Sequence, residues 1–212
     1  MQMVALDLDG TLVDQKTASR QWAEEFVSGQ QLDIDPGVVA SALAARRPKG
    51  EVFTDLVKFL DLTLDPAAVW ADYRRRLPGL LSCTDADRAA LVDFREAGWR
   101  IGIVTNGMVD NQEGKIRQLG LDALVDGLVI SAEVGVRKPS RAIFDILADR
   151  LSSPLKGWMV GDSLEADILG GHAAGLRTAL VYGSEGVEEV GLADLVVPTV
   201  GEAAARILAG GS

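Results

Sequence analysis

The sequence predicts an α/β fold: a doubly wound, parallel-sheet (Rossmann-like) core that carries an inserted all-helical cap. Two observations support this prediction. Short apolar runs recur along the chain, each followed by a longer amphipathic stretch, which is typical of a parallel sheet covered by helices on both faces. By contrast, residues 15–79 contain helical patterns and no strand signal. Because this segment falls between the first and second apolar runs, it is predicted to be an insertion into the sheet domain.

The apolar runs predict six strands, at residues 4–6, 101–104, 128–130, 158–160, 179–181 and 195–197. Between them, apolar residues at helical spacing predict helices within 86–97 and 139–150. Gly98 and Gly120 stand where glycines that end helices are expected. The predicted Rossmann-like core therefore comprises residues 1–14 and 80–212, and the cap comprises residues 15–79.

The insertion contains four helical stretches. Two of them begin at Asp35-Pro36 and Asp65-Pro66, each an N-cap residue followed by proline at the first helical position. The break between the second and third stretches carries three cations, Arg46, Arg47 and Lys49. A break of this kind can reach over a site, so these residues are candidate contacts for an anionic leaving group.

Composition narrows the functional classes. The 212 residues include 21 Lys and Arg against 31 Asp and Glu, a net charge of −10 that argues against binding to nucleic acid or an anionic membrane. A single cysteine and the absence of a long apolar run predict a cytoplasmic protein. The oligomeric state is not indicated. With one histidine in the chain, the acids and bases of any enzyme chemistry are expected to be carboxylates.

Polar residues follow four of the predicted strands, and the carboxyl ends of parallel strands share one edge, where ligands bind. Each group alone also suits a plain turn or a helix cap. Together, in this order, they predict one site. Its candidate residues are Asp7, Asp9 and Gly10 after the first strand, Thr105 and Asn106 after the second, Lys138 beyond the third, and Asp162 and Asp167 after the fourth.

This ordered set resembles the haloacid dehalogenase superfamily, in particular its phosphoglycolate phosphatase-like members with a helical cap. The resemblance spans nearly the whole chain and is weakest in residues 15–79. It implies that Asp7 is a nucleophile that forms an aspartyl-phosphate and that Asp9 is the general acid and base. Thr105, the Asn106 backbone N–H, Lys138 and Gly10 would bind the phosphate, with Thr105 and Lys138 also assisting catalysis. Because a halide leaves without a proton, the presence of Asp9 favours phosphoryl transfer over dehalogenation.

The four aspartates imply a cation. At about 4 Å and an effective dielectric constant near 20, each pair of like charges costs about 4 kcal/mol. The four ionised carboxylates carry four negative charges. Lys138 contributes one positive charge and a divalent ion contributes two, so one negative charge remains in excess. Oxygen ligands favour Mg²⁺, held by the Asp7 side chain, the Asp9 backbone carbonyl and Asp162, with Asp167 orienting Lys138 or a water on the metal.

The leading functional prediction is a Mg²⁺-dependent phosphatase that hydrolyses a small-molecule phosphomonoester. A phosphomutase of the same superfamily, acting on a sugar phosphate, is an alternative that isomerisation assays would separate. A phosphoaccepting signalling module is a further alternative, although such modules place the acceptor aspartate after a middle strand of the sequence and lack the insertion. The last alternative is a non-catalytic binding or scaffold protein, which would not release phosphate from any ester. The motifs do not identify the substrate.

Overall fold

The computed structural model describes residues 2–45, 47–182 and 191–210. The chain divides into two compact units, Met1–Val13 with Cys83–Ser212, and Asp14–Ser82. We call them the sheet unit and the helical unit. The second boundary follows Ser82 rather than residue 79, because the last helix of the helical unit continues to Leu80.

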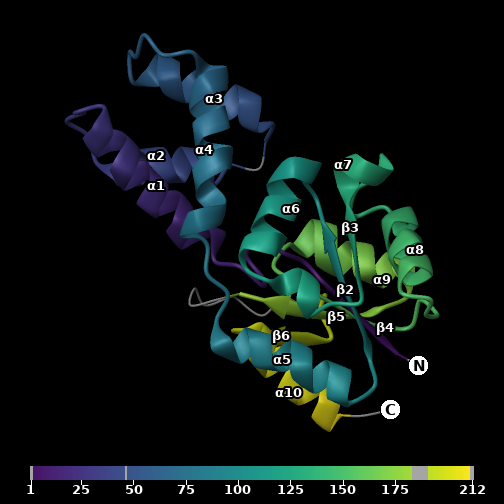
Figure 1. The fold of residues 1–212 in the computed structure, drawn as a ribbon. Coiled ribbons are helices and arrows are strands. Elements are labelled where there is room, and N and C mark those ends of the chain that lie inside the picture. The colour runs from purple at the N-terminus through teal and green to yellow at the C-terminus, as the bar shows by residue number, and fades with distance from the viewer. Residues whose placement is uncertain (1, 46, 183–190, 211–212) are drawn as a thin grey trace. The chain divides into compact units, whose positions relative to one another are not determined.

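The sheet unit is built on six parallel strands in the order β3-β2-β1-β4-β5-β6 (Figure 1). All six predicted strands are present. Their bounds are β1 (Met3–Leu6), β2 (Arg100–Thr105), β3 (Gly127–Ile130), β4 (Gly157–Gly161), β5 (Arg177–Val181) and β6 (Leu195–Val197). The four residues of β1 are fully buried, which explains why this strand is an uninterrupted apolar run rather than an alternating one.

Helices cover both faces of this sheet, as expected for a doubly wound fold. The helical segments are α5 (Asp85–Glu96), α6 (Val109–Gln118), η1 (Leu121–Ala123), α7 (Ser131–Val134), α8 (Arg141–Arg150), η2 (Leu164–Leu169), α9 (Gly170–Ala174) and α10 (Val200–Ala209). α5 packs beside α10, and α8 packs beside α9 (Figure 1). One core cluster joins Phe144 and Leu147 of α8 to Ala5 of β1 and Met159 of β4. The predicted α/β class is therefore confirmed.

The helical unit contains α1 (Gln15–Gly29), α2 (Pro36–Leu43), α3 (Lys49–Phe59) and α4 (Pro66–Leu80). The Asp35 and Asp65 carboxylates accept hydrogen bonds from the first-turn amides of α2 and α4, so both predicted caps are present. Its core is aromatic: the Trp22 ring lies 5.2 Å from that of Tyr73 and 6.0 Å from that of Phe53, measured between centroids. These rings pack against each other and fill the interior of the unit.

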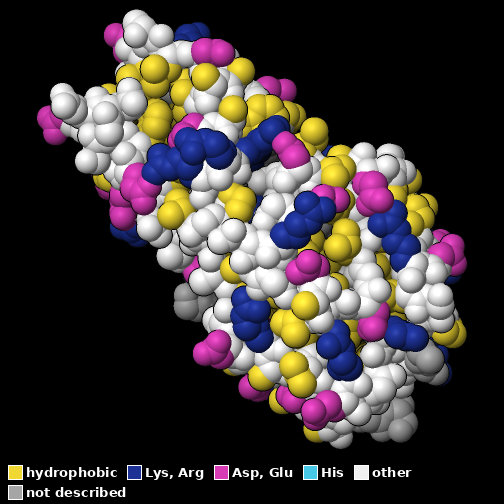
Figure 2. All heavy atoms as spheres, in the orientation of Figure 1, with side chains coloured by type: hydrophobic (Ala, Val, Ile, Leu, Met, Phe, Trp, Pro, Cys, Tyr) yellow, Lys and Arg dark blue, Asp and Glu magenta, His cyan; other side chains and the backbone are white. Residues whose placement is uncertain are grey.

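Surface charge is mixed on the face drawn in Figure 2, where acidic and basic side chains are interspersed. Among the described residues, no helix is long and apolar enough to cross a membrane.

Candidate active site

The site lies where the strand order of the sheet reverses. The chain proceeds from β1 through β2 to β3 on one side and then returns to β4 on the other side of β1. Asp7 directly follows β1 and Asp162 directly follows β4. In open parallel sheets such a reversal forms a crevice beyond the carboxyl ends of the strands, and ligands bind there.

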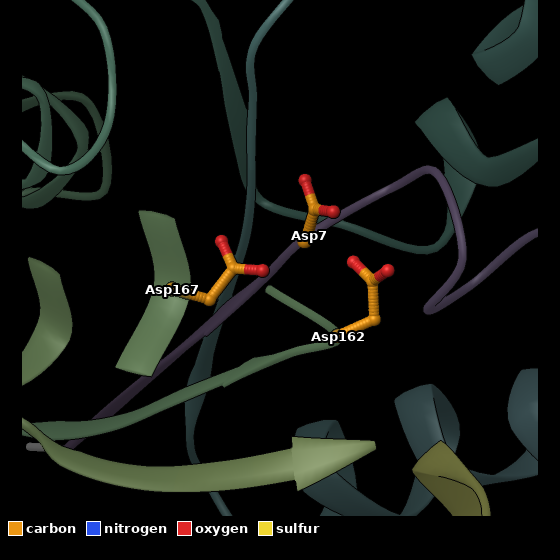
Figure 3. A group of neighbouring side chains, drawn as sticks. All are labelled: Asp7, Asp162 and Asp167. Carbon is orange, nitrogen blue, oxygen red and sulfur yellow. The ribbon is translucent and has the colours of Figure 1, made fainter. Parts of the chain in front are cut away.

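Three carboxylates converge at this point. Asp7, Asp162 and Asp167 each offer an oxygen atom, and these oxygens lie within 4.8 Å of one another. Figure 3 shows the three side chains arranged around a common space, Asp7 from the end of β1, Asp162 from the end of β4, and Asp167 from the following η2 segment. Asp7 and Asp167 are buried, and Asp162 is half-buried.

Lys138 neutralises part of this charge. Its Nζ donates to Asp7 Oδ1 and to Asp167 Oδ1, both at 2.6 Å. The other oxygen of Asp167 accepts the Ser163 backbone N–H at 3.0 Å. Because both Asp167 oxygens are engaged in this way, the geometry suits the orienting role predicted for this residue more than a direct metal contact.

Asn106 fixes the Lys138 backbone rather than reaching across the site. Its Nδ2 donates to the Lys138 carbonyl at 3.1 Å, and its Oδ1 accepts the Lys138 N–H at 3.0 Å. The phosphate contact predicted for Asn106 involves its backbone N–H, so this side-chain bridge is compatible with it. The pair of bonds holds the loop after β3 against the end of β2.

Burial dominates the ionisation of the site. It raises the pKa of the Asp7 carboxyl to about 7, against the opposing effect of the Lys138 ammonium, with Asp167 and Asp9 adding to the rise. For Lys138, burial works toward a lower pKa, but the adjacent carboxylates of Asp7 and Asp167 outweigh it and hold the pKa of the ammonium above its usual value. The two carboxylates therefore favour the charged form of Lys138.

The turn after β1 brings the backbone close to Asp162. Gly10 has φ +85°, in the left-handed region, and a Cβ at this position would lie 2.7 Å from Asp162 Oδ2. The next residue, Thr11, is buried, and its hydroxyl oxygen has no hydrogen-bond partner among the described residues. A buried hydroxyl without a partner is uncommon and suits a site that receives a polar ligand.

Asp9 does not join the other three carboxylates. Both of its oxygens contact Lys115 Nζ, at 2.7 and 2.8 Å, and Oδ2 also accepts from Gln112 Nε2 at 2.9 Å. The sequence-based prediction missed Lys115 and Gln112, which lie on α6, immediately after the Thr105–Gly107 motif. The sequence contained one signal of a further cation: after Lys138 and a divalent ion were counted, the four predicted aspartates still carried one excess negative charge. Lys115 supplies the positive charge that balances it.

The remaining charge fits a divalent cation. Lys115 pairs with Asp9, and Lys138 pairs with Asp7 and Asp167. When all three are ionised, the neighbouring carboxylates of Asp7, Asp162 and Asp167 carry two more charges than the Lys138 ammonium. A buried carboxyl with the raised pKa of Asp7 is only partly ionised at neutral pH, and a bound cation would favour its ionised form. Oxygen ligands at this spacing suit Mg²⁺.

Two of the three predicted cations of the helical unit, Arg47 and Lys49, have local partners. Arg47 forms an ion pair with Asp55 at 2.7 Å, beside a depression of about 580 Å³ that Trp70 also lines. Lys49 donates to the backbone carbonyls of Leu43 and Ala45 and so helps to cap the end of α2. Arg46 lies outside the described residues.

Fold and site together define an α/β protein with an acidic, lysine-containing centre at the reversal point of its sheet. A model of the haloacid dehalogenase-like hydrolase family matches residues 1–175. The chain belongs to this family, as its motifs predicted.

Relatives agree with this assignment, and a solved structure shares the fold. Pyrimidine 5'-nucleotidase YjjG of Escherichia coli is 42% identical over 104 residues, which are 48% of this chain and 43% of that protein, so the match spans less than half of the relative. Glyceraldehyde 3-phosphate phosphatase of Pyrococcus abyssi is 30% identical over 197 residues, 84% of this chain and 80% of that protein. The magnesium-bound structure of the HAD-hydrolase YfnB from Bacillus subtilis shares the fold, with a TM-score of 0.80 at 22% identity over 98% of each chain.

Proposed function

We propose that the protein is a Mg²⁺-dependent phosphatase that hydrolyses a small-molecule phosphomonoester through an aspartyl-phosphate on Asp7. The observation that carries the proposal is the convergence of Asp7, Asp162 and Asp167, two of which accept hydrogen bonds from Lys138. Asp9 follows two residues beyond the nucleophile. The two relatives named above, a nucleotidase and a sugar-phosphate phosphatase, act on small phosphate esters by their names, which supports the same substrate class.

In the first half of the reaction, an Asp7 carboxylate oxygen attacks phosphorus and the bond to the leaving oxygen breaks. Asp9 enters this step in its protonated form and donates that proton to the leaving oxygen, so the leaving group departs as a neutral alcohol. In the second half, Asp9 takes a proton from a water molecule as it attacks phosphorus, and the bond to Asp7 breaks. Inorganic phosphate is released and both aspartates return to their initial states.

The surrounding residues bind and orient the phosphoryl group. Lys138, the Thr105 hydroxyl and the Asn106 backbone N–H provide donors for its oxygens. The Gly10 N–H, which was also predicted to bind the phosphate, instead donates to the Val13 carbonyl at 2.9 Å. Lys138 also fixes the direction of the Asp7 carboxylate through the 2.6 Å hydrogen bond. Mg²⁺, held by Asp7, the Asp9 carbonyl and Asp162, would neutralise charge on the phosphoryl oxygens when bound.

Phosphate release tests the proposal. A panel of sugar phosphates, nucleoside monophosphates and short-chain phosphate esters is assayed with Mg²⁺ and, in parallel, with EDTA. We expect activity on at least one ester, its loss in EDTA, and a fall of at least about 100-fold in kcat for Asp7→Asn, because removing a nucleophile disables the catalytic unit. Asp145→Asn, a half-exposed carboxylate on α8, is the matched control and stays fully active.

Other outcomes identify other functions. Isomerisation of a sugar phosphate without net phosphate release would indicate a phosphomutase. A stable phosphoenzyme without turnover would indicate a signalling module, and no reaction with any ester would indicate a binding protein. Full activity of Asp7→Asn would refute the covalent mechanism.

The helical unit is, in this proposal, the cap that selects the substrate, and Arg47 is its candidate contact for an anionic leaving group. Arg47→Ala is then expected to raise KM for the physiological ester and to leave p-nitrophenyl phosphate unaffected. Unchanged kinetics on both substrates would remove Arg47 from the proposal.

A further inference from the structure

Two polar side chains of α6 are buried beside Asp9. Gln112 and Lys115 are each 1% exposed, although glutamine and lysine are among the residues that fold interiors most often exclude. They stand three positions apart and so project from the same face of the helix. Burial of both is costly unless their polar atoms are satisfied, and the contacts with Asp9 contribute to that.

The two side chains hold the Asp9 carboxylate at three points. Lys115 contacts both oxygens, at 2.7 and 2.8 Å, and Gln112 contacts Oδ2 at 2.9 Å. Asp9 itself lies on the turn after β1 with its side chain 26% exposed. Without these contacts, free rotation about its side-chain bonds would let the carboxylate turn to solvent, so α6 restricts its direction.

The same amide nitrogen of Gln112 also reaches Thr105. Nε2 donates to Thr105 Oγ1 at 2.7 Å, so one side-chain NH₂ group links Thr105 at the end of β2 to Asp9 after β1. Because the Thr105 oxygen accepts this bond, its own hydrogen can be directed to another acceptor. Gly107 leaves room for the bridge, since a Cβ at that position would lie 2.8 Å from Gln112 Cδ.

We propose that Gln112 and Lys115 are positioning residues that set the direction of the Asp9 carboxylate and of the Thr105 hydroxyl. This inference rests on the proposed function, in which Asp9 moves the proton in both halves of the reaction and Thr105 contacts the phosphate. Neither α6 side chain needs to touch the substrate. Both act by confining groups that do, and confinement of this kind accelerates a reaction by removing unproductive orientations.

The two halves of the reaction respond differently to a disordered Asp9. With p-nitrophenyl phosphate the leaving group departs without a proton, so formation of the phosphoenzyme hardly depends on Asp9. Attack of water still needs Asp9 as a base. When the positioning contacts are lost, nitrophenolate should therefore be released in a rapid burst, followed by a slow steady state. A variant that is only partly unfolded should instead show a lower steady-state rate of release without a burst.

The experiment uses the Mg²⁺-loaded full chain and rapid mixing with p-nitrophenyl phosphate. The variants are Lys115→Met, Gln112→Met, Asp9→Asn and the double variant Asp9→Asn/Lys115→Met. Arg117→Met is the control, because it removes a cation from the exposed side of α6 where Arg117 pairs with Glu113. Circular dichroism and thermal melting establish that each variant is folded.

For Lys115→Met we expect a burst and a fall in kcat of about 10-fold or more, since general acid–base catalysis is worth about 100-fold or more in total. KM should fall with kcat, so that kcat/KM changes less than about twofold, because formation of the phosphoenzyme is hardly affected. Gln112→Met should also show a burst, with a smaller loss of kcat but a lower kcat/KM than wild type, because Thr105, which contacts the phosphate, is affected too. The double variant should match Asp9→Asn, since residues that act through one group are not additive. Arg117→Met should behave as wild type.

Three results would overturn the inference: unchanged kcat in both α6 variants, a lower kcat without a burst, or a loss in Lys115→Met that adds fully to that of Asp9→Asn. If Lys115→Met does not fold, Gln112→Met, which removes only hydrogen bonds of a neutral group, decides the outcome by the same criteria. A wild-type rate in Asp9→Asn would instead refute the role of Asp9 in the proposed function, so the two failures are distinguishable.

Discussion

Asp7→Asn is expected to stabilise the metal-free protein while it abolishes turnover. The Asp7 side chain is buried, and this burial raises the pKa of its carboxyl from 3.8 to about 7, with Asp167 and Asp9 contributing and Lys138 opposing. A neutral amide of the same shape avoids the cost of the buried negative charge and can still accept a hydrogen bond from Lys138. The nucleophile is therefore held in place at the expense of stability.

The size of the effect follows from the pKa difference between the folded and unfolded states. A rise from 3.8 to about 7 is roughly three pH units, and each unit is worth about 1.4 kcal/mol. The folded state binds this proton more tightly than the unfolded chain. The associated stability is thus fully present below pH 3.8 and is lost as pH rises to about 7. Above pH 7 the ionised carboxylate costs the folded state up to about 4 kcal/mol.

Urea unfolding in EDTA, at several values of pH, measures this cost. The free energy of unfolding of Asp7→Asn should exceed that of wild type by about 1 kcal/mol near pH 4.5 and by up to about 4 kcal/mol at pH 8. Asp145→Asn, the half-exposed control on α8, should stay within about 0.5 kcal/mol of wild type. Adding Mg²⁺ should stabilise wild type more than Asp7→Asn, because a bound ion stabilises only the state that holds it.

The reasoning is refuted if Asp7→Asn is no more stable than wild type at pH 8, or if the difference between the two proteins does not change with pH.

Two further predictions concern the turn at the site and the core of the helical unit. Gly10→Ala places a Cβ 2.7 Å from Asp162 Oδ2 at a φ of +85°. The strained backbone should lower the free energy of unfolding by about 1–2 kcal/mol, and the contact should displace Asp162. Mg²⁺ titration should then show weaker binding than in wild type, and an unchanged affinity would contradict this prediction. Tyr73→Phe removes the buried 2.8 Å hydrogen bond between the Tyr73 and Ser19 hydroxyls. We expect the free energy of unfolding to fall by about 1–2 kcal/mol. A variant as stable as wild type in urea would show that this bond contributes nothing to stability.

Local patterns predicted the strands and several helix boundaries because their causes are local. A strand buried on both faces must be apolar at consecutive positions, and β1 with four buried residues is such a strand. Likewise, Asp35 and Asp65 cap helices through amides only two residues away. The predicted boundary after residue 79 lies within α4, which continues to Leu80, because no residue of the sequence marks the end of that helix.

The polar residues of α6 were missed because their partners are distant in sequence. A glutamine and a lysine in an amphipathic helix are ordinarily solvent-facing, and Lys115 lies 106 residues from Asp9. Similarly, Lys49 was interpreted as a candidate substrate contact from its place in a break between helices. In the structure its ammonium donates to nearby carbonyls at the end of α2.

The sequence by itself determined the class of fold, the family and the strand-end carboxylates. Parallel strands have a local apolar pattern, and their carboxyl ends share one edge of the sheet, so Asp7 and Asp162 were predicted at the same edge. They are close together because β1 and β4 are neighbours in the sheet, which the strand order of the structure decides. Only the tertiary structure decided how their charges are balanced. Whether a lysine faces water or a carboxylate depends on how its helix packs, and that packing pairs Lys115 with Asp9 and leaves Lys138 to Asp7 and Asp167.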